Sequence, residues 1–296
     1  MTGHVPRVKA RLSLHAHRRV RGHLEGEYAS AQVGRSMDFN DLREYVRGDD
    51  VKDLDWKASA RTGQMLVKRF VAQRKHTVLL AVSTGREMAA ANAVGVPKRD
   101  LAVFTAGLVG WLAVRHGDLV ALAHGDAETQ AGERAAGGEL HLERCLGAVH
   151  DATTTRAAAC DLPALLRHVA RTVRRRTLLL VVCDDTEATP ALVSALRRMT
   201  AQHEVLMITI GDLDPTVLPA EAAPALDLGR GRLLPSWVRG DDELAQQLAE
   251  TSAAESRAFR ETCASLGVVH EHVSDEAGAL AAVGRLLERQ RHARRR

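Results

Sequence analysis

The chain has 296 residues, 45% of them hydrophobic and 26% charged, a balance typical of folded globular proteins. This length allows one large α/β domain with an appendage, or two domains. The composition argues against disorder over most of the chain. With only 3 Trp, 2 Tyr and 4 Phe, the core is expected to be chiefly aliphatic.

The formal charge of +4 is concentrated at the two ends of the chain. Six basic residues and no acidic one precede Glu25, and five basic residues follow Glu288; removing these 11 from +4 leaves −7 for the body. Solvated basic tails are the preferred interpretation, with an acidic partner, anionic lipid or RNA as alternatives. We expect no specific nucleic-acid partner, because the body is acidic.

The cysteine pattern indicates a reducing compartment. The 4 cysteines show no CxxC spacing, and no secretory hydrophobic segment precedes them. No apolar run approaches the roughly 20 residues needed to span a bilayer. We therefore expect a cytoplasmic protein without a transmembrane segment.

The first 75 residues lack long periodic patterns. Residues 1–24 are polar and basic and are predicted to be flexible, with a short alternation at 11–15 as the only sign of a strand. Residues 25–75 are dense in Asp, Arg, Gly and aromatic residues, which predicts an ordered but loop-rich segment.

From residue 76 onward, short apolar runs alternate with helical stretches. Strands are predicted at 77–83, 119–123, 177–183, 204–210, 225–228 and 267–274. Helices are predicted at 97–116, 162–175, 190–200, 241–266 and 275–291, and 125–140 is interpreted as a variable connection. This repetition predicts an α/β fold with a doubly wound, mostly parallel sheet over 76–290, followed by an arginine tail at 291–296.

Polar and aromatic residues recur at many fixed spacings before the first strand. They read Asp38-Phe39-x-x-Leu42-Arg43-Glu44-Tyr45, Gly48-Asp49-Asp50, Asp55-Trp56 and Ser59-Ala60-Arg61. Nearly residue by residue, they resemble the signature of the bacterial domain-of-unknown-function family number 58, and the similarity of layout extends over about residues 20–290. The resemblance implies a von Willebrand A-like, Rossmann-type domain and genomic company with MoxR-type AAA+ ATPases. It supplies no reaction.

A doubly wound sheet binds its ligands at the carboxyl ends of its strands. A von Willebrand A domain holds a metal ion there through Asp-x-Ser-x-Ser, a threonine and an aspartate. The resemblance places Ser83, Gly85 and Glu87 in the first loop, with Thr154 and Asp184 at the other positions. Hard cations need several oxygen ligands, including carboxylates. We therefore expect a degenerate site without a cofactor; a bound divalent cation such as magnesium is the alternative.

The signature segment is the candidate partner surface. Its closely spaced and nearly balanced charges favour a network of charge-assisted hydrogen bonds that fixes an irregular loop. Its aromatic residues are expected to anchor the segment on the sheet, with exposure to a partner as the alternative. The candidate partner-binding residues are Asp38, Arg43, Tyr45, Asp49, Asp50, Asp55, Trp56 and Arg61.

Catalysis is the competing interpretation. A metal-dependent hydrolase would use Asp49, Asp50, Asp53 and Asp55 as its carboxylates. The sequence has no His-Glu-x-x-His motif, phosphate loop or nucleophile elbow. The spacing His270-x-His272 puts two imidazoles on one strand face, as His15-x-His17 would, and we interpret both pairs as solvated.

These observations together favour binding over catalysis. We predict a non-enzymatic, cytoplasmic protein-protein interaction module that acts with a MoxR-type AAA+ ATPase in the assembly or remodelling of another complex.

Overall fold

The computed structural model describes residues 3–15, 24–28, 41–46, 54–69, 75–219 and 224–293. The chain forms two compact units, one made of Met1–Ala31 with His76–Arg296 and the other of Gln32–Lys75. Residues 24–28 are helical and belong to the larger unit, although the sequence pattern grouped most of them with the signature segment.

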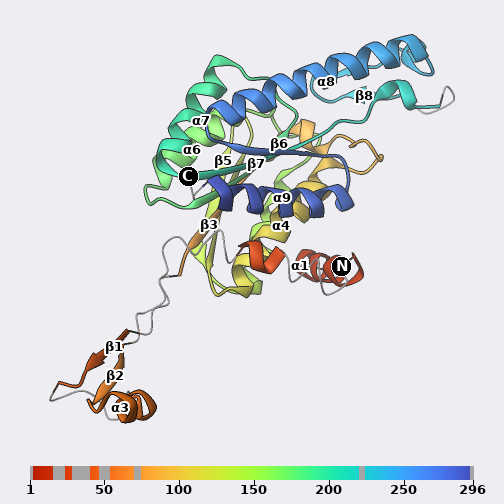
Figure 1. The fold of residues 1–296 in the computed structure, drawn as a ribbon. Coiled ribbons are helices and arrows are strands. Elements are labelled where there is room, and N and C mark those ends of the chain that lie inside the picture. The colour runs from red at the N-terminus through yellow and green to blue at the C-terminus, as the bar shows by residue number, and fades with distance from the viewer. Residues whose placement is uncertain are drawn as a thin grey trace. The chain divides into compact units, whose positions relative to one another are not determined.

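The larger unit is built on a six-stranded sheet with the order β10-β7-β6-β3-β4-β5 (Figure 1). Its strands are β3 (Thr77–Ser83), β4 (Leu119–Gly125), β5 (Gln130–Ala136), β6 (Leu178–Asp184), β7 (Glu204–Ile210) and β10 (Val269–Val273). Neighbouring strands are parallel, except that β5 is antiparallel to β4. Strand order reverses between β3 and β6, the topological switch point. The predicted doubly wound, mostly parallel α/β fold is confirmed.

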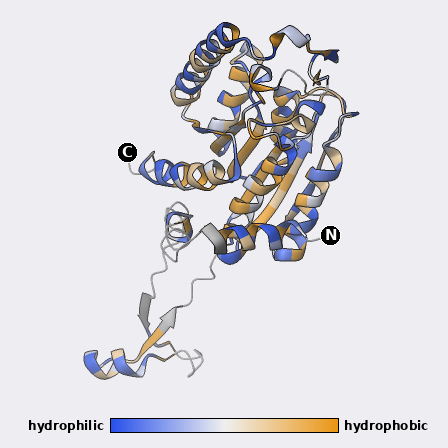
Figure 2. Cartoon of the chain, turned by 90° about the vertical axis from the view of Figure 1, so that its right-hand side faces the viewer, coloured by the Kyte–Doolittle hydropathy of each residue, from blue (hydrophilic) through white to orange (hydrophobic). Residues whose placement is uncertain are grey.

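Helices cover both faces of the sheet. One face packs against α1 (His4–His15), α4 (Lys98–Arg115), α5 (Glu139–Ala152) and α9 (Glu276–Ala293). The other packs against α6 (Leu162–Thr172), α7 (Pro190–Gln202) and α8 (Asp242–Ser265). Because side chains alternate along a strand, Leu80 of β3 joins the first core and Leu79 the second. Figure 2 shows the resulting hydrophobic strands and inner helix faces.

The start of the chain is a packed helix rather than the predicted flexible entry. Val5, Val8 and Leu12 of α1 are buried in the core formed with α4 and α5. Their spacing of three and four residues places them on one helical face, so the strand suggested at 11–15 is also wrong.

Basic residues near both termini lie on the helices α1 and α9 and form ion pairs, although their side chains stay about half exposed to solvent. Lys9 Nζ lies 2.6 Å from a carboxylate oxygen of Glu139, and Arg289 Nη1 lies 2.9 Å from one of Glu271. Acidic residues of the body thus neutralise part of the terminal charge. The remaining basic residues of the two ends lie outside the described residues: Arg18, Arg19, Arg21, Arg294, Arg295 and Arg296.

The stretch at 125–140, interpreted as a variable connection, holds the edge strand β5 and the start of α5. Side chains of β5 are exposed or half-buried, so the strand lacks the apolar run that marks the central strands. Gly138 precedes α5 with a φ of 92°, a conformation that glycine adopts without strain.

The smaller unit contains β1 (Asp41–Glu44), α3 (Trp56–Thr62) and β2 (Leu66–Arg69), with β1 and β2 antiparallel. Asp55 caps α3, because its Oδ1 accepts the backbone N–H groups of Lys57 and Ala58 at 3.1 and 3.0 Å. The hydroxyl of Ser59 accepts the N–H of Leu66 at 2.9 Å and so joins α3 to β2. Throughout the described ranges, no helix combines the length and the apolar character needed to cross a membrane.

Candidate functional site

Polar side chains meet at the carboxyl ends of the strands beside the topological switch point. Ser83 ends β3, Asp184 ends β6, and Asp212 follows β7. Lys98, the first residue of α4, reaches the same place. Ligands of doubly wound folds bind at this edge.

Lys98 is fully buried, and its ammonium contacts two aspartates. Its Nζ lies 2.5 Å from Oδ1 of Asp184 and also donates to Oδ1 of Asp212. Burial alone would lower the pKa of Lys98, but the two carboxylates raise it above its ordinary value. The first turn of a helix carries a partial positive charge, so a lysine here needs these carboxylates. Lys98 is therefore a permanent cation within the site.

The carboxyl group of Asp184 responds to the same surroundings. Burial, together with the neighbouring carboxylate of Asp212, raises the pKa of Asp184 to about 7 against the opposing effect of the Lys98 ammonium. Near neutral pH, Asp184 thus carries a proton part of the time. A hard divalent cation prefers ionised carboxylates that no other cation already neutralises.

The loop after β3 is held by backbone contacts with residues 158–160. A Cβ atom at position 85 would lie 2.4 Å from the backbone nitrogen of Cys160, so only glycine fits at Gly85. Glu87, in η2 (Arg86–Ala89), accepts the N–H of Cys160 with Oε2 at 2.8 Å. The passing chain fills the space of a side chain at 85, and the Glu87 carboxylate is bound to the backbone.

The predicted threonine position and its neighbour differ in their surroundings. Thr154 is exposed, while the hydroxyl of Thr153 donates to the carbonyl of Val149 in α5 at 2.8 Å. Ser83 is buried, and its hydroxyl has no hydrogen-bond partner among the described residues. Within the same residues, no group of three or more His, Cys, Asp or Glu side chains is arranged to hold a metal ion. The residues present do not fit the metal ion that the fold resemblance implies.

A cavity of about 480 Å³ opens beside this cluster. This volume lies within the roughly 300–1,000 Å³ of small-ligand sites. One part of its wall carries the carboxylates of Glu87, Asp184, Asp212 and Asp227. The other part is apolar and includes Leu213, Leu218, Leu226, Leu228 and Leu234.

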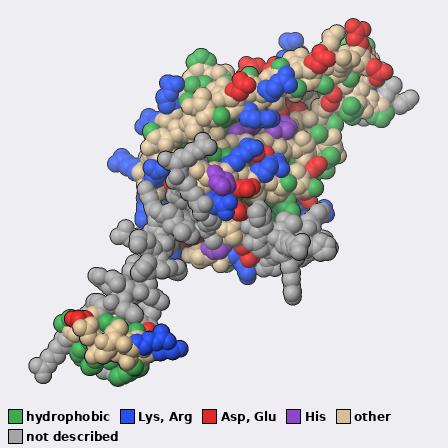
Figure 3. Space-filling view, viewed as in Figure 1, with side chains coloured by type: hydrophobic (Ala, Val, Ile, Leu, Met, Phe, Trp, Pro, Cys, Tyr) green, Lys and Arg blue, Asp and Glu red, His purple; other side chains and the backbone are tan. Residues whose placement is uncertain are grey.

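Large apolar side chains are exposed on the segment from β8 to η4, and one of them, Leu226, lines this cavity. Leu226 of β8 (Leu226–Asp227) faces Leu233 of β9 (Arg232–Leu233), and they are 50% and 66% exposed. Trp237, in η4 (Ser236–Val238), is 68% exposed. We call Leu226, Leu233 and Trp237 the hairpin patch. In Figure 3, apolar and acidic side chains lie close together where the β8–β9 region meets the start of α8.

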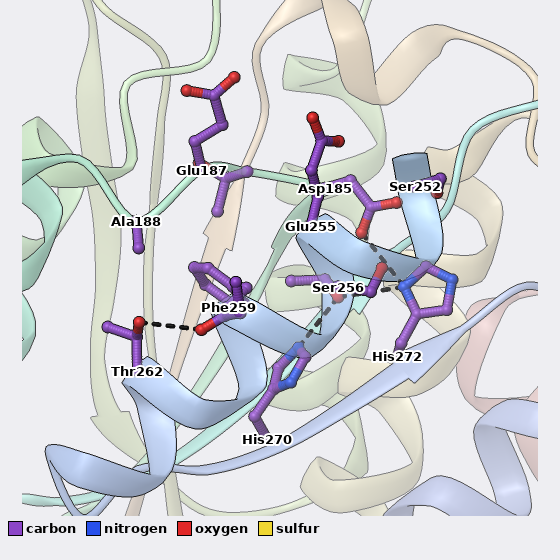
Figure 4. A pocket seen from close by; sticks show the side chains of 13 residues that line it. Asp185, Glu187, Ala188, Ser252, Glu255, Ser256, Phe259, Thr262, His270 and His272 are labelled. Atoms are coloured by element: carbon purple, nitrogen blue, oxygen red, sulfur yellow. Dashed lines mark hydrogen bonds and ion pairs between the residues drawn. The ribbon is translucent and has the colours of Figure 1, made fainter. Parts of the chain in front are cut away.

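A second cavity, of about 410 Å³, lies between α8 and the ends of β6, β7 and β10 (Figure 4). His272 Nδ1 lies 3.1 Å from Oδ1 of Asp185. The hydroxyl of Thr209 lies 3.0 Å from Nε2 of His270 and 3.3 Å from Nδ1 of His272. A Cβ atom at Gly211 would come within 2.8 Å of the His272 ring, so glycine leaves room for it.

The two histidines of β10 have opposite protonation tendencies. Burial lowers the pKa of His270 to about 4, whereas the hydrogen bond with Asp185 raises the pKa of His272. His270 is 5% exposed and packs edge-on against Phe259, with ring centroids 5.2 Å apart. The interpretation of solvated histidines is therefore wrong for His270. His17 lies outside the described residues, as does the side chain of His15.

Some of the predicted partner-binding residues can be placed. Asp55 acts as a helix cap, Trp56 is 66% exposed, and Arg61 is exposed. Tyr45 is half-buried, and its N–H donates to the carbonyl of Met65 at 2.8 Å. The partner-binding candidates Asp38, Asp49 and Asp50 lie outside the described residues, as does the side chain of Arg43. Asp53, a candidate only for the alternative hydrolase, also lies outside them.

The aromatic residues near the signature divide between two environments. Tyr28 is fully buried in the larger unit, where its hydroxyl donates to Oδ2 of Asp118 at 2.9 Å. Trp56 is instead exposed on the smaller unit. The predicted anchoring role thus fits Tyr28 but not Trp56, and Phe39 and Phe70 lie outside the described residues.

Sequence reasoning missed Lys98 and Asp212. A lysine at the start of a helix whose middle turns are apolar was an available signal, because such a charge needs a partner once the helix is buried. A second signal was that Asp212 follows β7 as Asp184 ends β6, so both lie at one edge of a parallel sheet.

A family model described as "Protein of unknown function DUF58" matches residues 41–228. The chain belongs to the DUF58 family. Uncharacterized proteins from Mycobacterium tuberculosis and Mycobacterium bovis are each 29% identical to this DUF58 chain over 213 residues. The matched region is 70% of this chain and 65% of each relative, so the chain covers less than two thirds of their length.

Three solved structures are similar to parts of the DUF58 chain. An aerotolerance-related membrane protein from Bacteroides fragilis matches with a TM-score of 0.46 and 14% identity, covering 72% of this chain and 99% of that one. A von Willebrand factor type A protein from Catenulispora acidiphila matches at 0.41 and 12%, covering 77% and 44%. The PilB minor pilin from Streptococcus sanguinis matches at 0.46 and 6%, covering 77% and 65%.

Proposed function

We propose that this DUF58 chain is a protein-protein interaction module that docks its partner on the hairpin patch and the adjoining cavity. The observation that carries the proposal is the exposure of Leu226, which lines a cavity at the carboxyl end of the sheet, of its cross-strand partner Leu233, and of Trp237 four residues further along the chain. Exposed apolar patches with polar rims mark interaction sites, and tryptophan is prominent among residues that dominate binding energy.

Hydrogen bonds to backbone carbonyls hold the hairpin in position. The N–H of Leu234 donates to the carbonyl of Ala225 at 2.8 Å, and Arg86 Nη2 donates to the carbonyl of Gly229 at 2.9 Å. The second bond links the hairpin to the loop after β3. A preformed surface binds with a smaller loss of conformational entropy than one that must order on contact.

For the partner, we propose a MoxR-type AAA+ ATPase, with a role in assembly or remodelling of another complex. The family resemblance supports this choice, because it implies genomic company with such ATPases. The proposed role is non-enzymatic and cytoplasmic, and it requires neither a cofactor nor a nucleic acid.

Single substitutions in the hairpin patch test the proposal. We expect Leu226→Glu and Trp237→Ala to weaken binding to a MoxR-type ATPase of the same genome by about 30-fold each, the effect of losing roughly 2 kcal/mol. Isothermal titration calorimetry measures both. Leu140→Glu is the matched control, since Leu140 is 81% exposed on α5 and lies outside the cavity. Unchanged binding by both patch variants contradicts the proposal.

A metal-dependent hydrolase remains the competing interpretation. Of its four proposed carboxylates, Asp55 lies in the described residues, and two backbone N–H groups already engage its Oδ1. Calorimetric titration with magnesium and manganese separates the two functions. Binding of either ion that disappears when Asp49, Asp50 and Asp53 are replaced by asparagine would favour the hydrolase.

A further inference from the structure

The positive charge at the carboxyl end of the sheet is buried, whereas in a metal-bridged site the positive charge of the ion is open to the partner. In such a site, a hard cation accepts an oxygen ligand from the partner. Here the cation is Lys98, which is covalently attached, fully buried and shared between Asp184 and Asp212. Because the Lys98 ammonium is buried and paired with two carboxylates of the protein, it is not accessible to a carboxylate of the partner.

What the cavity presents instead is the carboxylate of Asp212. This side chain is 58% exposed, whereas that of Asp184 is 13% exposed. Glu87 and Asp227 each have a basic neighbour of their own, Arg86 at 3.8 Å and Arg230 at 4.0 Å, whereas Asp212 shares the one ammonium of Lys98 with Asp184. Two carboxylates therefore face a single cation at this point, and Asp212 is the more exposed of the two. None of the residues that line the cavity within the described ranges is Lys, Arg or His.

The apolar wall sets a second requirement for the ligand. Leu213, Leu218 and Leu226 lie on the same cavity as Asp212. Lysine and arginine carry a long aliphatic stem below the charged group, and such stems pack against apolar surface while the charge meets a carboxylate. A large apolar neighbour in the partner would in turn cover the hairpin patch.

We infer that the cavity binds a lysine or arginine side chain of a partner segment, next to a large apolar residue, with no metal ion between the two proteins. The inference rests on the proposed function and adds the chemistry of the partner. Lys98 takes the place of the bridging cation, and the carboxylate of Asp212 forms an ion pair with the lysine or arginine of the partner.

Selection from a randomised peptide library on the full chain tests this inference. We expect the recovered peptides to pair Lys or Arg with a large apolar residue, and to bind equally well in EDTA and in magnesium. Fluorescence anisotropy then compares one recovered peptide with versions in which its basic residue is glutamate or methionine. Loss of a charge-assisted hydrogen bond corresponds to a decrease in affinity of about tenfold.

Protein variants assign the contact to the cavity. Asp212→Asn is expected to weaken the recovered peptide about tenfold and Leu226→Glu more strongly, whereas Asp242→Asn and Leu140→Glu leave it unchanged. Asp242 is the matched control because it is an exposed aspartate in the first turn of α8. The peptide variants keep the test decisive if Asp212→Asn fails to fold.

The possible failures can be told apart. The inference is overturned if the recovered peptides are acidic or require magnesium. It is also overturned if binding is unaffected by replacing the peptide's basic residue or by Asp212→Asn. In each of these cases the proposed function survives if Leu226→Glu still abolishes binding. Peptides that bind Leu226→Glu as well as the wild type overturn the proposed function itself.

Discussion

The ammonium nitrogen of Lys98 lies 2.5 Å from Oδ1 of Asp184, joining the first residue of the most buried helix to the end of a central strand. A covalently attached cation cannot dissociate or exchange, unlike a bound ion. The positive charge of Lys98 at the carboxyl end of this sheet therefore does not depend on the supply of metal ions.

Lys98→Met removes this cation while retaining much of the side-chain volume. We expect a loss of stability on the order of 3 kcal/mol at about pH 8, because a buried carboxylate loses its partner. The loss should be smaller at about pH 6. Burial already raises the pKa of Asp184 to about 7 in the folded protein. The contribution of Asp184 to the free energy of unfolding is therefore greatest below its pKa of 3.8 in the unfolded chain, and it is lost as the pH rises through 7. Urea unfolding at the two pH values measures the difference.

Two further variants isolate the cause. Combining Lys98→Met with Asp184→Asn and Asp212→Asn removes the uncompensated charge and should restore part of the stability. Lys9→Met breaks the exposed pair with Glu139 and should cost at most about 1 kcal/mol. An equal loss for Lys98→Met at both pH values would contradict the explanation.

Gly85→Ala tests whether close backbone contact shapes the loop after β3. The new Cβ would lie 2.4 Å from the nitrogen and 2.7 Å from the Cα of Cys160, so the backbone must shift. We expect destabilisation of about 1–3 kcal/mol in urea unfolding. Gly147→Ala is the matched control within α5, where nothing lies within 4 Å of the new Cβ. It should stabilise the protein by about 0.5–1 kcal/mol, and the same sign for both variants would refute the argument.

The central strands could be predicted from the sequence because they are buried on both faces. The run at 77–83 predicted β3 with its observed bounds, and 204–210 did the same for β7. Where one face meets solvent, the signal weakens, which explains why β5 was missed. The helix α1 was missed because its three buried residues stand among basic ones, and their burial depends on α4 and α5.

The sequence predicted where in the fold the site lies, but not which side chains contact one another there. Asp184 was placed correctly at the end of its strand, since strand ends follow from hydrophobic runs. Its contact with Lys98 spans 86 residues, and that between Lys98 and Asp212 spans 114. Local pattern carries no information on such pairs. The folded topology brings them together.

In the smaller unit, the neighbouring residues Asp55 and Trp56 are expected to differ in their effect on stability. Asp55→Ala removes the cap of α3 and should destabilise this unit by about 1 kcal/mol, while Asp55→Asn retains an acceptor and should have a smaller effect. Trp56→Ala, at an exposed site, should leave stability unchanged. Hydrogen exchange at the amides of Lys57 and Ala58 measures the cap directly. Faster exchange in Trp56→Ala than in Asp55→Ala would show that the tryptophan, not the cap, holds the helix.

The two histidines of β10 predict opposite effects of pH on stability. His270 has a folded pKa of about 4 against 6.5 in the unfolded chain, so its contribution is complete above pH 6.5 and is lost as the pH falls toward 4, a total on the order of 3 kcal/mol. His272 has a raised pKa, so its contribution is complete below pH 6.5 and is lost as the pH rises through its folded value. In urea unfolding across this range, His270→Gln should therefore reduce the acid sensitivity of the protein, whereas His272→Gln should destabilise it more under acidic than under alkaline conditions. Parallel stability curves for the wild type and His270→Gln would show that His270 does not stay neutral in the fold.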